Sequence, residues 1–376
     1  MSFLSDIFKK SSIKQPPEKF TIRGVNVCVS AEEKPFVEEL FSSLAAIPTG
    51  RRAIEDMQKY KTEFLLETSM GTAGGYFEPE NNKIVMAKSM GMDFMQFALV
   101  HEARHLLQNN QGRNETEEQN LDYASRLMIN RATEADAQTQ ALQACLEWQA
   151  QGHTAPMKRF EQCYKAITDA YQKNHSLSDA FKGWYKDEIN VASYEHSYDV
   201  VPYLSHLTDE ADKQPFVSLK PADVAKFCGA ERVENFEKFL DSRQARHVNL
   251  MTKTAVEFYD AVSTAKGAPH DPSLDQLPVR DLKGNTAAQI AAEKFLYRAC
   301  NEFDPSTTKE PVKRNIFKAL SAAVKAIDSI NHASARGEIN PKAEAVLQAC
   351  KVRAGKAVTE KPVKAFLSAW LSSQRC

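Results

Sequence analysis

Residues 94–108 read FMQFALVHEARHLLQ, and within them His101 to His105 form the pattern His-Glu-x-x-His. Apolar residues stand on both sides of the pattern, and neither glycine nor proline occurs between Phe94 and Asn110. A helix from Met92 to Asn110 is therefore predicted. Residues four apart project from the same face of a helix, so both imidazoles can reach one ion.

The residue types in this pattern suit a hydrolytic zinc site. Zinc accepts imidazole nitrogens at about 2.0–2.1 Å, and two histidines one helical turn apart meet that requirement. A carboxylate at Glu102, next to the first histidine, can take a proton from water and later pass it to a leaving amine. The sequence predicts one Zn²⁺ held by His101 and His105, with Glu102 as general base. The competing interpretation is an exposed helical face on which Glu102 forms a salt bridge.

A third protein ligand is expected from the next predicted helix, Leu121 to Gly152. Residues 131–137 read RATEADA and offer two carboxylates, Glu134 and Asp136, among small side chains. Small neighbours let two helices approach closely, as a shared ion requires. Glu134 is predicted as the ligand and Asp136 as the partner of a ligating histidine. Asp136 as the ligand remains an alternative, and so does a solvated acidic turn.

Other segments predict a mixture of strands and helices. Residues 72–77 and 83–86 are strand-like and flank the turn sequence EPENN, which indicates a hairpin. Lys19 to Ser30 alternates apolar and polar residues and predicts a strand. Beyond Gly152 the chain favours helix after helix, among them one from Met157 to Lys173.

The pattern and its surroundings resemble known zinc peptidases. His101 to His105 followed by Glu134 looks like the gluzincin arrangement, although the residues around Glu134 depart from its N-E-x-x-S-D pattern. The preceding hairpin resembles that of minimal zincins. The stretch Glu134 to Ala137 is similar to the downstream helix of ImmA/IrrE-type and related bacterial metallopeptidases. The resemblance covers about Lys19 to Cys145 and is specific at HEARH.

This resemblance implies a minimal zincin domain of α+β class with a small sheet, and the helical patterns that follow predict a mainly α-helical C-terminal region after it. It also implies that a substrate peptide adds as an extra strand near Gly75 and Tyr76. We expect a flexible tail over residues 1–18, a catalytic domain over 19–206 and a helical region over 207–376. The expected function is zinc-dependent hydrolysis of peptide bonds. The alternatives are a vestigial zincin fold without catalysis and a helical interaction module.

Peptide hydrolysis also needs a group that stabilises the oxyanion of the tetrahedral intermediate. Tyr194, His196 and Tyr198 are candidate donors, and Tyr123 is a further one. Packing of these aromatic side chains in the core is the alternative interpretation.

Composition excludes several classes of protein. The chain has 376 residues, a net charge of −1 and seven scattered cysteines without a CxxC pair, which argues against a disulfide scaffold and against a cysteine-based zinc site. No run of 18 apolar residues occurs, and the N-terminus lacks a secretory signal. A cytoplasmic protein without a transmembrane segment is predicted.

Charge is distributed unevenly along the chain. Lys309 to Cys376 carries 13 Lys and Arg against 5 Asp and Glu. The basic helices expected there are a candidate surface for a protein partner, whereas few aromatic residues are present to stack on bases, so nucleic acid is not predicted as a partner. A solvated helical face is the alternative interpretation. The basic residues concerned are Lys313, Arg314, Lys318, Lys325, Lys351, Arg353 and Lys356.

Overall fold

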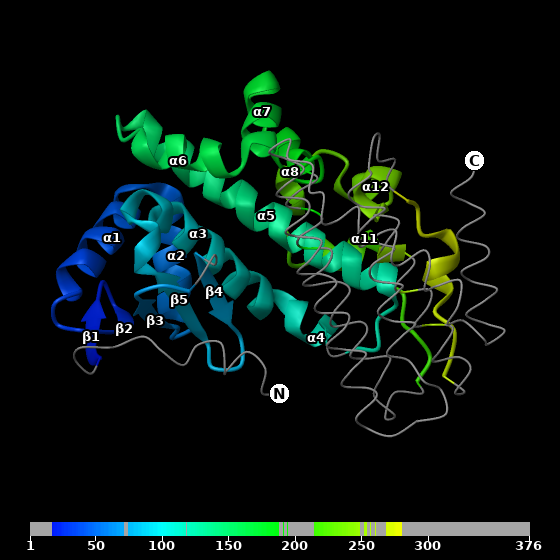
Figure 1. Ribbon diagram of the computed structural model, residues 1–376, viewed down its shortest axis with the longest axis horizontal. Coiled ribbons are helices and arrows are strands. Elements are labelled where there is room, and N and C mark those ends of the chain that lie inside the picture. Colours follow the sequence, from blue (N-terminus) through cyan, green and yellow to red (C-terminus); the bar gives the residue numbers. More distant parts are fainter. Residues whose placement is uncertain are drawn as a thin grey trace, which may run out of the picture. The chain divides into compact units, whose positions relative to one another are not determined.

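The computed structural model describes residues 17–70, 74–117, 119–187, 214–248 and 268–279, together with residues 191, 194, 252, 253, 256 and 260. The chain divides into two compact units, and Figure 1 labels the strands of the first. The first comprises Met1–Glu118, Ala132–Asp187 and Pro221–Lys238, and the second comprises Gln119–Arg131, Glu188–Lys220 and Phe239–Cys376.

A five-stranded mixed sheet with the order β1-β2-β3-β5-β4 lies in the first unit. Its strands are β1 (Glu18–Ile22), β2 (Val25–Val29), β3 (Glu63–Glu67), β4 (Gly75–Glu78) and β5 (Lys83–Ala87). Strands β2, β3 and β5 run parallel, while β1 and β4 are antiparallel edge strands. Strand β5 is buried from Ile84 to Ala87, because it lies between two strands. The predicted hairpin is confirmed as β4 and β5.

The stretch from Lys19 to Ser30, predicted as one strand, is two strands joined by a tight turn. Arg23 and Gly24 have φ of 47° and 76°, the left-handed values that a two-residue hairpin turn requires. The Gln58 side chain donates a hydrogen bond of 2.5 Å to the Arg23 carbonyl. The alternation of apolar residues continues through the turn, so periodicity alone did not reveal the reversal.

Helices α1 (Lys34–Ala46) and α2 (Pro48–Lys59) connect β2 to β3, which runs parallel to it. Strand β3 is an element that the sequence pattern did not predict. Helix α1 buries one stripe, Val37, Leu40, Phe41 and Leu44, at the spacing of a single helical face. The Phe41 ring packs edge-on against Phe64 of β3 with centroids 5.4 Å apart. These contacts hold the helical layer on the sheet.

The predicted helix of the His-Glu-x-x-His pattern is confirmed as α3 (Met92–Gln108). It follows a 3-10 turn, η1 (Lys88–Met90), and begins after Gly91, whose φ is 81°. A π-helical turn, η2 (Asn109–Arg113), succeeds it. Helix α3 contacts α1, α2, α6, β4 and β5, so it is buried on nearly all sides.

Helix α5 (Tyr123–Ala150) confirms the long helix predicted after α3. The helix predicted from Met157 to Lys173 is wrong at Tyr164, whose φ of −133° separates α6 from α7. No glycine or proline marks this break in the sequence. The remaining helical elements of the first unit are α4 (Asn114–Glu117), α6 (Ala155–Cys163), α7 (Lys165–Asn174), α8 (Leu177–Trp184), α11 (Pro221–Val224), η4 (Ala230–Arg232) and α12 (Phe236–Leu240).

The second unit is held by a buried carboxylate. Asp271 accepts hydrogen bonds of 2.8 Å from the Tyr123 N–H and 2.9 Å from the Ser273 N–H. Single bridges also join Leu121 to Val217 and Val248 to Val279. Its described helical elements beyond the start of α5 are α13 (Arg243–Arg246) and η5 (Pro272–Gln276).

The described chain is α+β, as predicted. The predicted domain boundaries stay predictions, because residues 1–16, most of 188–213 and all of 280–376 lie outside the described residues. Across the described part, no helix is both long and apolar enough to cross a membrane. The four cysteines described there are free thiols.

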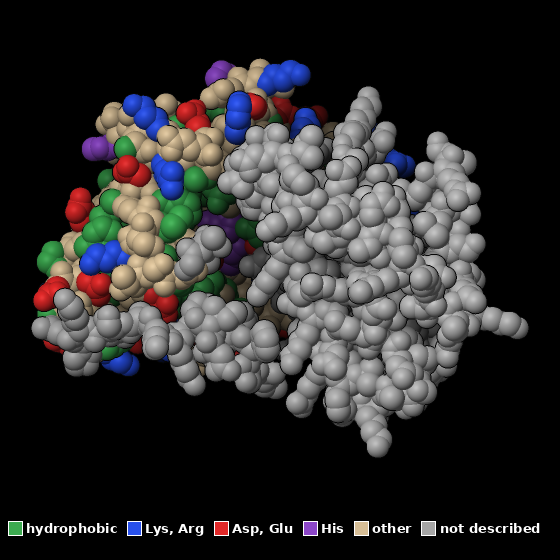
Figure 2. Space-filling view, in the orientation of Figure 1, with side chains coloured by type: hydrophobic (Ala, Val, Ile, Leu, Met, Phe, Trp, Pro, Cys, Tyr) green, Lys and Arg blue, Asp and Glu red, His purple; other side chains and the backbone are tan. Residues whose placement is uncertain are grey.

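On the coloured part of the face drawn in Figure 2, Lys and Arg side chains are interspersed with Asp and Glu side chains. The basic residues from Lys313 to Lys356, predicted to contact a partner, lie outside the described residues. Their role therefore remains a prediction.

The start of β4 packs so closely on α3 that it requires glycine. A Cβ atom at Gly74 would overlap the ring of Phe94, which is buried and packs edge-on against Phe97. We expect Gly74→Ala to lower the free energy of unfolding by about 1–3 kcal/mol, measured by urea denaturation. Phe94→Leu in the same chain should recover part of that loss, because it removes the overlapping ring atoms. A Gly74→Ala protein as stable as the parent would show that the two elements separate easily.

Candidate metal centre

Two imidazoles meet on the buried face of α3. His101 and His105 are 7% and 8% exposed, and their Nε2 atoms lie 2.9 Å apart. The rings are nearly perpendicular, at 84°. The four-residue spacing within one helix produces this arrangement without an interruption of the backbone.

The Glu134 carboxylate on α5 completes a three-residue cluster. Its Oε2 lies 3.4 Å from His101 Nε2, and its Oε1 lies 3.3 Å from His105 Nε2. Tetrahedral bonds of about 2.0–2.1 Å separate ligand atoms by about 3.3–3.4 Å. The small residues Ala132 and Ala135 are fully buried beside Glu134, in agreement with a close approach of α5.

The donor set fits a divalent cation. Glu134 Oε2 and His101 Nδ1 are buried and have no hydrogen-bond partner among the described residues. Facing imidazole nitrogens and a carboxylate form a cluster of electron-pair donors, which a metal ion stabilises. Burial alone would raise the pKa of Glu134, but the two facing histidines outweigh it and hold this pKa below its usual range. Glu134 therefore stays ionised at neutral pH, as a ligand must.

Glu102 lies beside this cluster with a different environment. Its carboxylate, 7% exposed as a residue, is within 4.8 Å of ligand atoms of His101 and His105. Burial, together with the negative charge of Glu134, raises the pKa of Glu102 to about 7, against the opposing effects of His101 and a hydrogen bond from the Phe77 backbone. A group with a pKa near neutrality can both accept and donate a proton.

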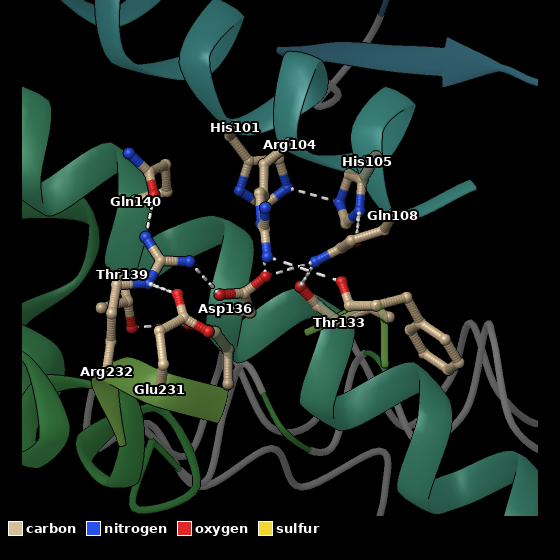
Figure 3. Close-up of polar contacts among 12 residues, drawn as sticks. His101, Arg104, His105, Gln108, Thr133, Asp136, Thr139, Gln140, Glu231 and Arg232 are labelled. Carbon is tan, nitrogen blue, oxygen red and sulfur yellow. Dashed lines mark hydrogen bonds and ion pairs between the residues drawn. The ribbon is translucent and has the colours of Figure 1, made fainter. Parts of the chain in front are cut away.

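Asp136, the alternative ligand, lies in the same helix but faces other partners (Figure 3). It accepts hydrogen bonds from Arg104 at 2.5 Å, Gln108 at 2.8 Å and Arg232 at 2.7 Å. No described contact joins Asp136 directly to His101 or His105. Among the two carboxylates, the structure therefore brings Glu134 to the imidazoles.

Gly75 and Tyr76, predicted to bind substrate, lie in the edge strand β4. The Ala87 N–H donates to the Gly74 carbonyl at 3.0 Å, so backbone groups of alternate residues point toward β5. Gly75 and Phe77 consequently direct their backbone groups away from β5, toward the edge where no described strand pairs with β4, whereas those of Tyr76 pair with Val85. The Tyr76 side chain is 38% exposed.

The oxyanion donors expected from the sequence stay predictions. Tyr194 belongs to the second compact unit, as does Tyr123. His196 and Tyr198 lie outside the described residues.

Tyr164 is a candidate functional residue that sequence reasoning missed. It occupies the break between α6 and α7, and its hydroxyl forms a hydrogen bond with the Gln138 side chain. Burial, and to a smaller extent the charges of Glu134 and Glu102, raise the pKa of this hydroxyl above its ordinary value. The hydroxyl therefore stays protonated at neutral pH, in the electrostatic field of both carboxylates. The sequence pattern there predicted an unbroken helix and no functional role.

A pocket of about 380 Å³ opens on the other face of α3. Val100, Ala103 and Leu107 line it, and α3 turns these residues away from the imidazoles because it has 3.6 residues per turn. Neither histidine nor Glu102 lines this pocket, so it is distinct from the candidate metal centre.

Residues 25–229 match the model of the Putative metallopeptidase family (DUF6782), which is more than half of the chain. The matched segment contains every residue of the cluster described above. Comparisons with curated proteins and with solved structures found no match. The family match implies a metal and supports a peptidase.

Two isosteric substitutions separate the candidate third ligands. We expect Glu134→Gln to weaken zinc binding more strongly than Asp136→Asn, because Glu134 reaches both imidazoles and Asp136 does not. A residue that only supports a ligand typically contributes about 10- to 100-fold to affinity. Competition with a chelator measures both dissociation constants. The reverse order would identify Asp136 as the ligand.

Proposed function

We propose that this chain, which belongs to the putative metallopeptidase family DUF6782, is a zinc-dependent peptidase of the gluzincin type. His101, His105 and Glu134 would hold one Zn²⁺, and Glu102 would act as general base. The observation that carries the proposal is the convergence of two Nε2 atoms and a carboxylate within 3.4 Å, with a second buried carboxylate beside them.

Zinc agrees with the chemistry of this donor set. Two imidazoles and one carboxylate are the three protein ligands typical of hydrolytic zinc sites, which keep a fourth position open. When bound, zinc supplies Lewis acidity to a water molecule and to the carbonyl of the bond to be cleaved. The likeness to ImmA/IrrE-type enzymes, and the zincin fold that it implies, form part of this proposal.

Glu102 moves the protons of the reaction. Its carboxylate accepts a proton from the attacking water and then donates that proton to the leaving amine. In the metal-free protein, burial raises the pKa of Glu102 to about 7, so this carboxylate is readily protonated there. The hydrogen bond from the Phe77 backbone orients the carboxylate, so β4 contributes to the position of the base.

The open edge of β4 would bind the polypeptide substrate. An extended peptide that pairs with the outward backbone groups of Gly75 forms an additional strand, and its side chains need no particular sequence. Because Phe77 of the same strand contacts Glu102, a peptide along this edge would run past the general base. Edge-strand pairing therefore links substrate binding to catalysis.

Tyr164 would donate a hydrogen bond to the oxyanion. Its hydroxyl stays protonated because burial raises its pKa, and the charges of Glu134 and Glu102 act on it in the same direction. A donor in place before the reaction stabilises the developing negative charge. Tyr194, His196 and Tyr198 remain alternative donors.

Two other functions compete with catalysis. A vestigial zincin fold would keep the metal and lose the use of Glu102, and a helical interaction module would act through the basic C-terminal segment. The burial of Glu102 beside the imidazoles favours catalysis, since a structural zinc site needs no free carboxylate. A cytoplasmic location remains part of the proposal.

Glu102→Gln is the direct test of the mechanism. We expect this protein to bind zinc as the parent does and to lose about 10²- to 10⁴-fold in peptide hydrolysis, because the amide cannot accept the proton. New peptide N-termini, quantified by mass spectrometry in cells that express each form, measure the cleavage of any polypeptide substrate.

His101→Ala is the companion variant, and it should lose both zinc and hydrolysis. A Glu102→Gln protein that cleaves as well as the parent would contradict the mechanism. Zinc bound by the parent without any cleavage that depends on Glu102 would support the vestigial function.

Tyr164→Phe tests the oxyanion donor. In other hydrolytic enzymes, the loss of one oxyanion donor lowers kcat by about 10²- to 10³-fold. We therefore expect a marked fall in kcat, while KM and zinc affinity change little. Tyr171→Phe, the same substitution at a partly exposed position of α7, is the control. Equal kcat for the two variants would exclude Tyr164 from this role.

A further inference from the structure

Asp136 is the centre of a polar network on the side of the metal centre that faces η4 (Figure 3). Its buried carboxylate receives three donors from two parts of the chain: Arg104 and Gln108 of α3, and Arg232 of η4. Arg232 follows Asp136 by 96 residues. A buried carboxylate with several charged donors is held in one orientation.

The chemistry of these partners determines the orientation of the Gln108 side chain. Its Nε2 lies 2.8 Å from Asp136 Oδ2 and 3.0 Å from the Thr133 carbonyl. A carboxylate and a backbone carbonyl only accept hydrogen bonds, so the Gln108 atom that faces them must be the amide nitrogen. The amide oxygen of Gln108 is then directed to His105.

That orientation determines in turn the protonation of His105. Gln108 Oε1 lies 2.9 Å from His105 Nδ1 and can only accept, so Nδ1 carries the proton. In the neutral imidazole, Nε2 then bears the lone pair, and Nε2 is the atom that faces His101 and Glu134. His105 is thereby prepared to bind a cation through Nε2.

The first histidine lacks such support. His101 Nδ1 is buried and has no hydrogen-bond partner within the described part of the chain. No described contact at Nδ1 therefore helps to fix its tautomer, in contrast to His105. The two predicted ligands differ, and His105 is the one that the surrounding protein orients.

We propose that Gln108, Arg104 and Arg232 are positioning residues for the metal centre, which act through Asp136 to keep the Nε2 lone pair of His105 directed at the ion. The inference rests on the proposed function, because it requires that the cluster binds a metal. It makes η4 a part of the site, although this segment lies about 100 residues beyond the ligands in sequence. Outer partners of this kind typically affect metal affinity about 10- to 100-fold.

Two variants interrupt the network at different points. Arg232→Gln removes the charged donor to Asp136, and Gln108→Met removes the acceptor for His105 with little change in side-chain size. We expect each to raise the zinc dissociation constant about 10- to 100-fold in chelator competition. Arg232→Lys, which keeps the charge without the planar donor geometry, should recover part of the affinity.

Arg52→Gln is the matched control. Arg52 lines the same pocket as Arg232 and donates to Thr49 instead of Asp136. It should leave zinc affinity unchanged, whereas a general effect of arginine removal would weaken binding in both variants. The double variant Arg232→Gln with Gln108→Met should bind zinc no more weakly than Gln108→Met alone, since both changes act along one path.

The tautomer provides a readout that needs no metal and no activity. In the metal-free parent with ¹⁵N-labelled histidine, long-range ¹H–¹⁵N spectra should show a protonated Nδ1 for His105, assigned by its absence from His105→Gln. Gln108→Met should abolish this preference. Thermal unfolding of the metal-free variants identifies any that fail to fold, and the remaining variant carries the test.

The outcomes distinguish this inference from the function on which it rests. If the folded parent binds no zinc, the proposed function fails, and this inference fails with it. A second outcome is that the parent binds zinc while Gln108→Met and Arg232→Gln have dissociation constants within about threefold of the parent value, which is less than the change expected from residues that support a ligand. In that case the positioning role is wrong and the proposed function stands. Zinc affinity that falls in both variants, with an altered His105 tautomer, supports the positioning role.

Discussion

The buried meeting of Glu134 with His101 and His105 is the constraint around which the first unit is built. A carboxylate removed from water is costly unless opposite charge or hydrogen bonds compensate it. The two imidazoles are 3.3–3.4 Å away, and they belong to a different helix. Helix α5 must therefore pack against α3 at one depth and rotation, and the buried residues Ala132 and Ala135 allow that approach.

The sheet contributes to the centre through its edge. Strand β4 approaches α3 closely enough that Gly74 cannot bear a side chain, and its Phe77 backbone donates to Glu102. One short strand thus positions the candidate base and presents an open backbone edge beside it. Burial and the nearby Glu134 charge give Glu102 a pKa suited to proton transfer, while Glu134 itself remains ionised. The pKa values of these two glutamates differ because their neighbours differ.

Sequence reasoning predicted features that depend on local spacing and missed two places where the backbone changes direction. It predicted α3 and the hairpin, since helical period and turn composition are local properties. It also favoured Glu134 over Asp136 as the carboxylate that joins the histidines. It predicted one strand across the Arg23 turn and one helix through Tyr164, because apolar periodicity continues through both. Tyr164, whose hydroxyl pKa is affected by the charges of Glu134 and Glu102, lies at that break.

The sequence by itself determined that His101 and His105 lie on one face of a helix with a carboxylate beside the first, because 3.6 residues per turn aligns positions four apart. It also indicated that acidic residues in a later helix stood among small neighbours. Only the tertiary structure decided that Glu134 faces the imidazoles while Asp136 receives Arg104 and Arg232. That choice depends on the rotation of α5 against α3 and on η4, and contacts between segments about 100 residues apart leave no periodic pattern in the chain.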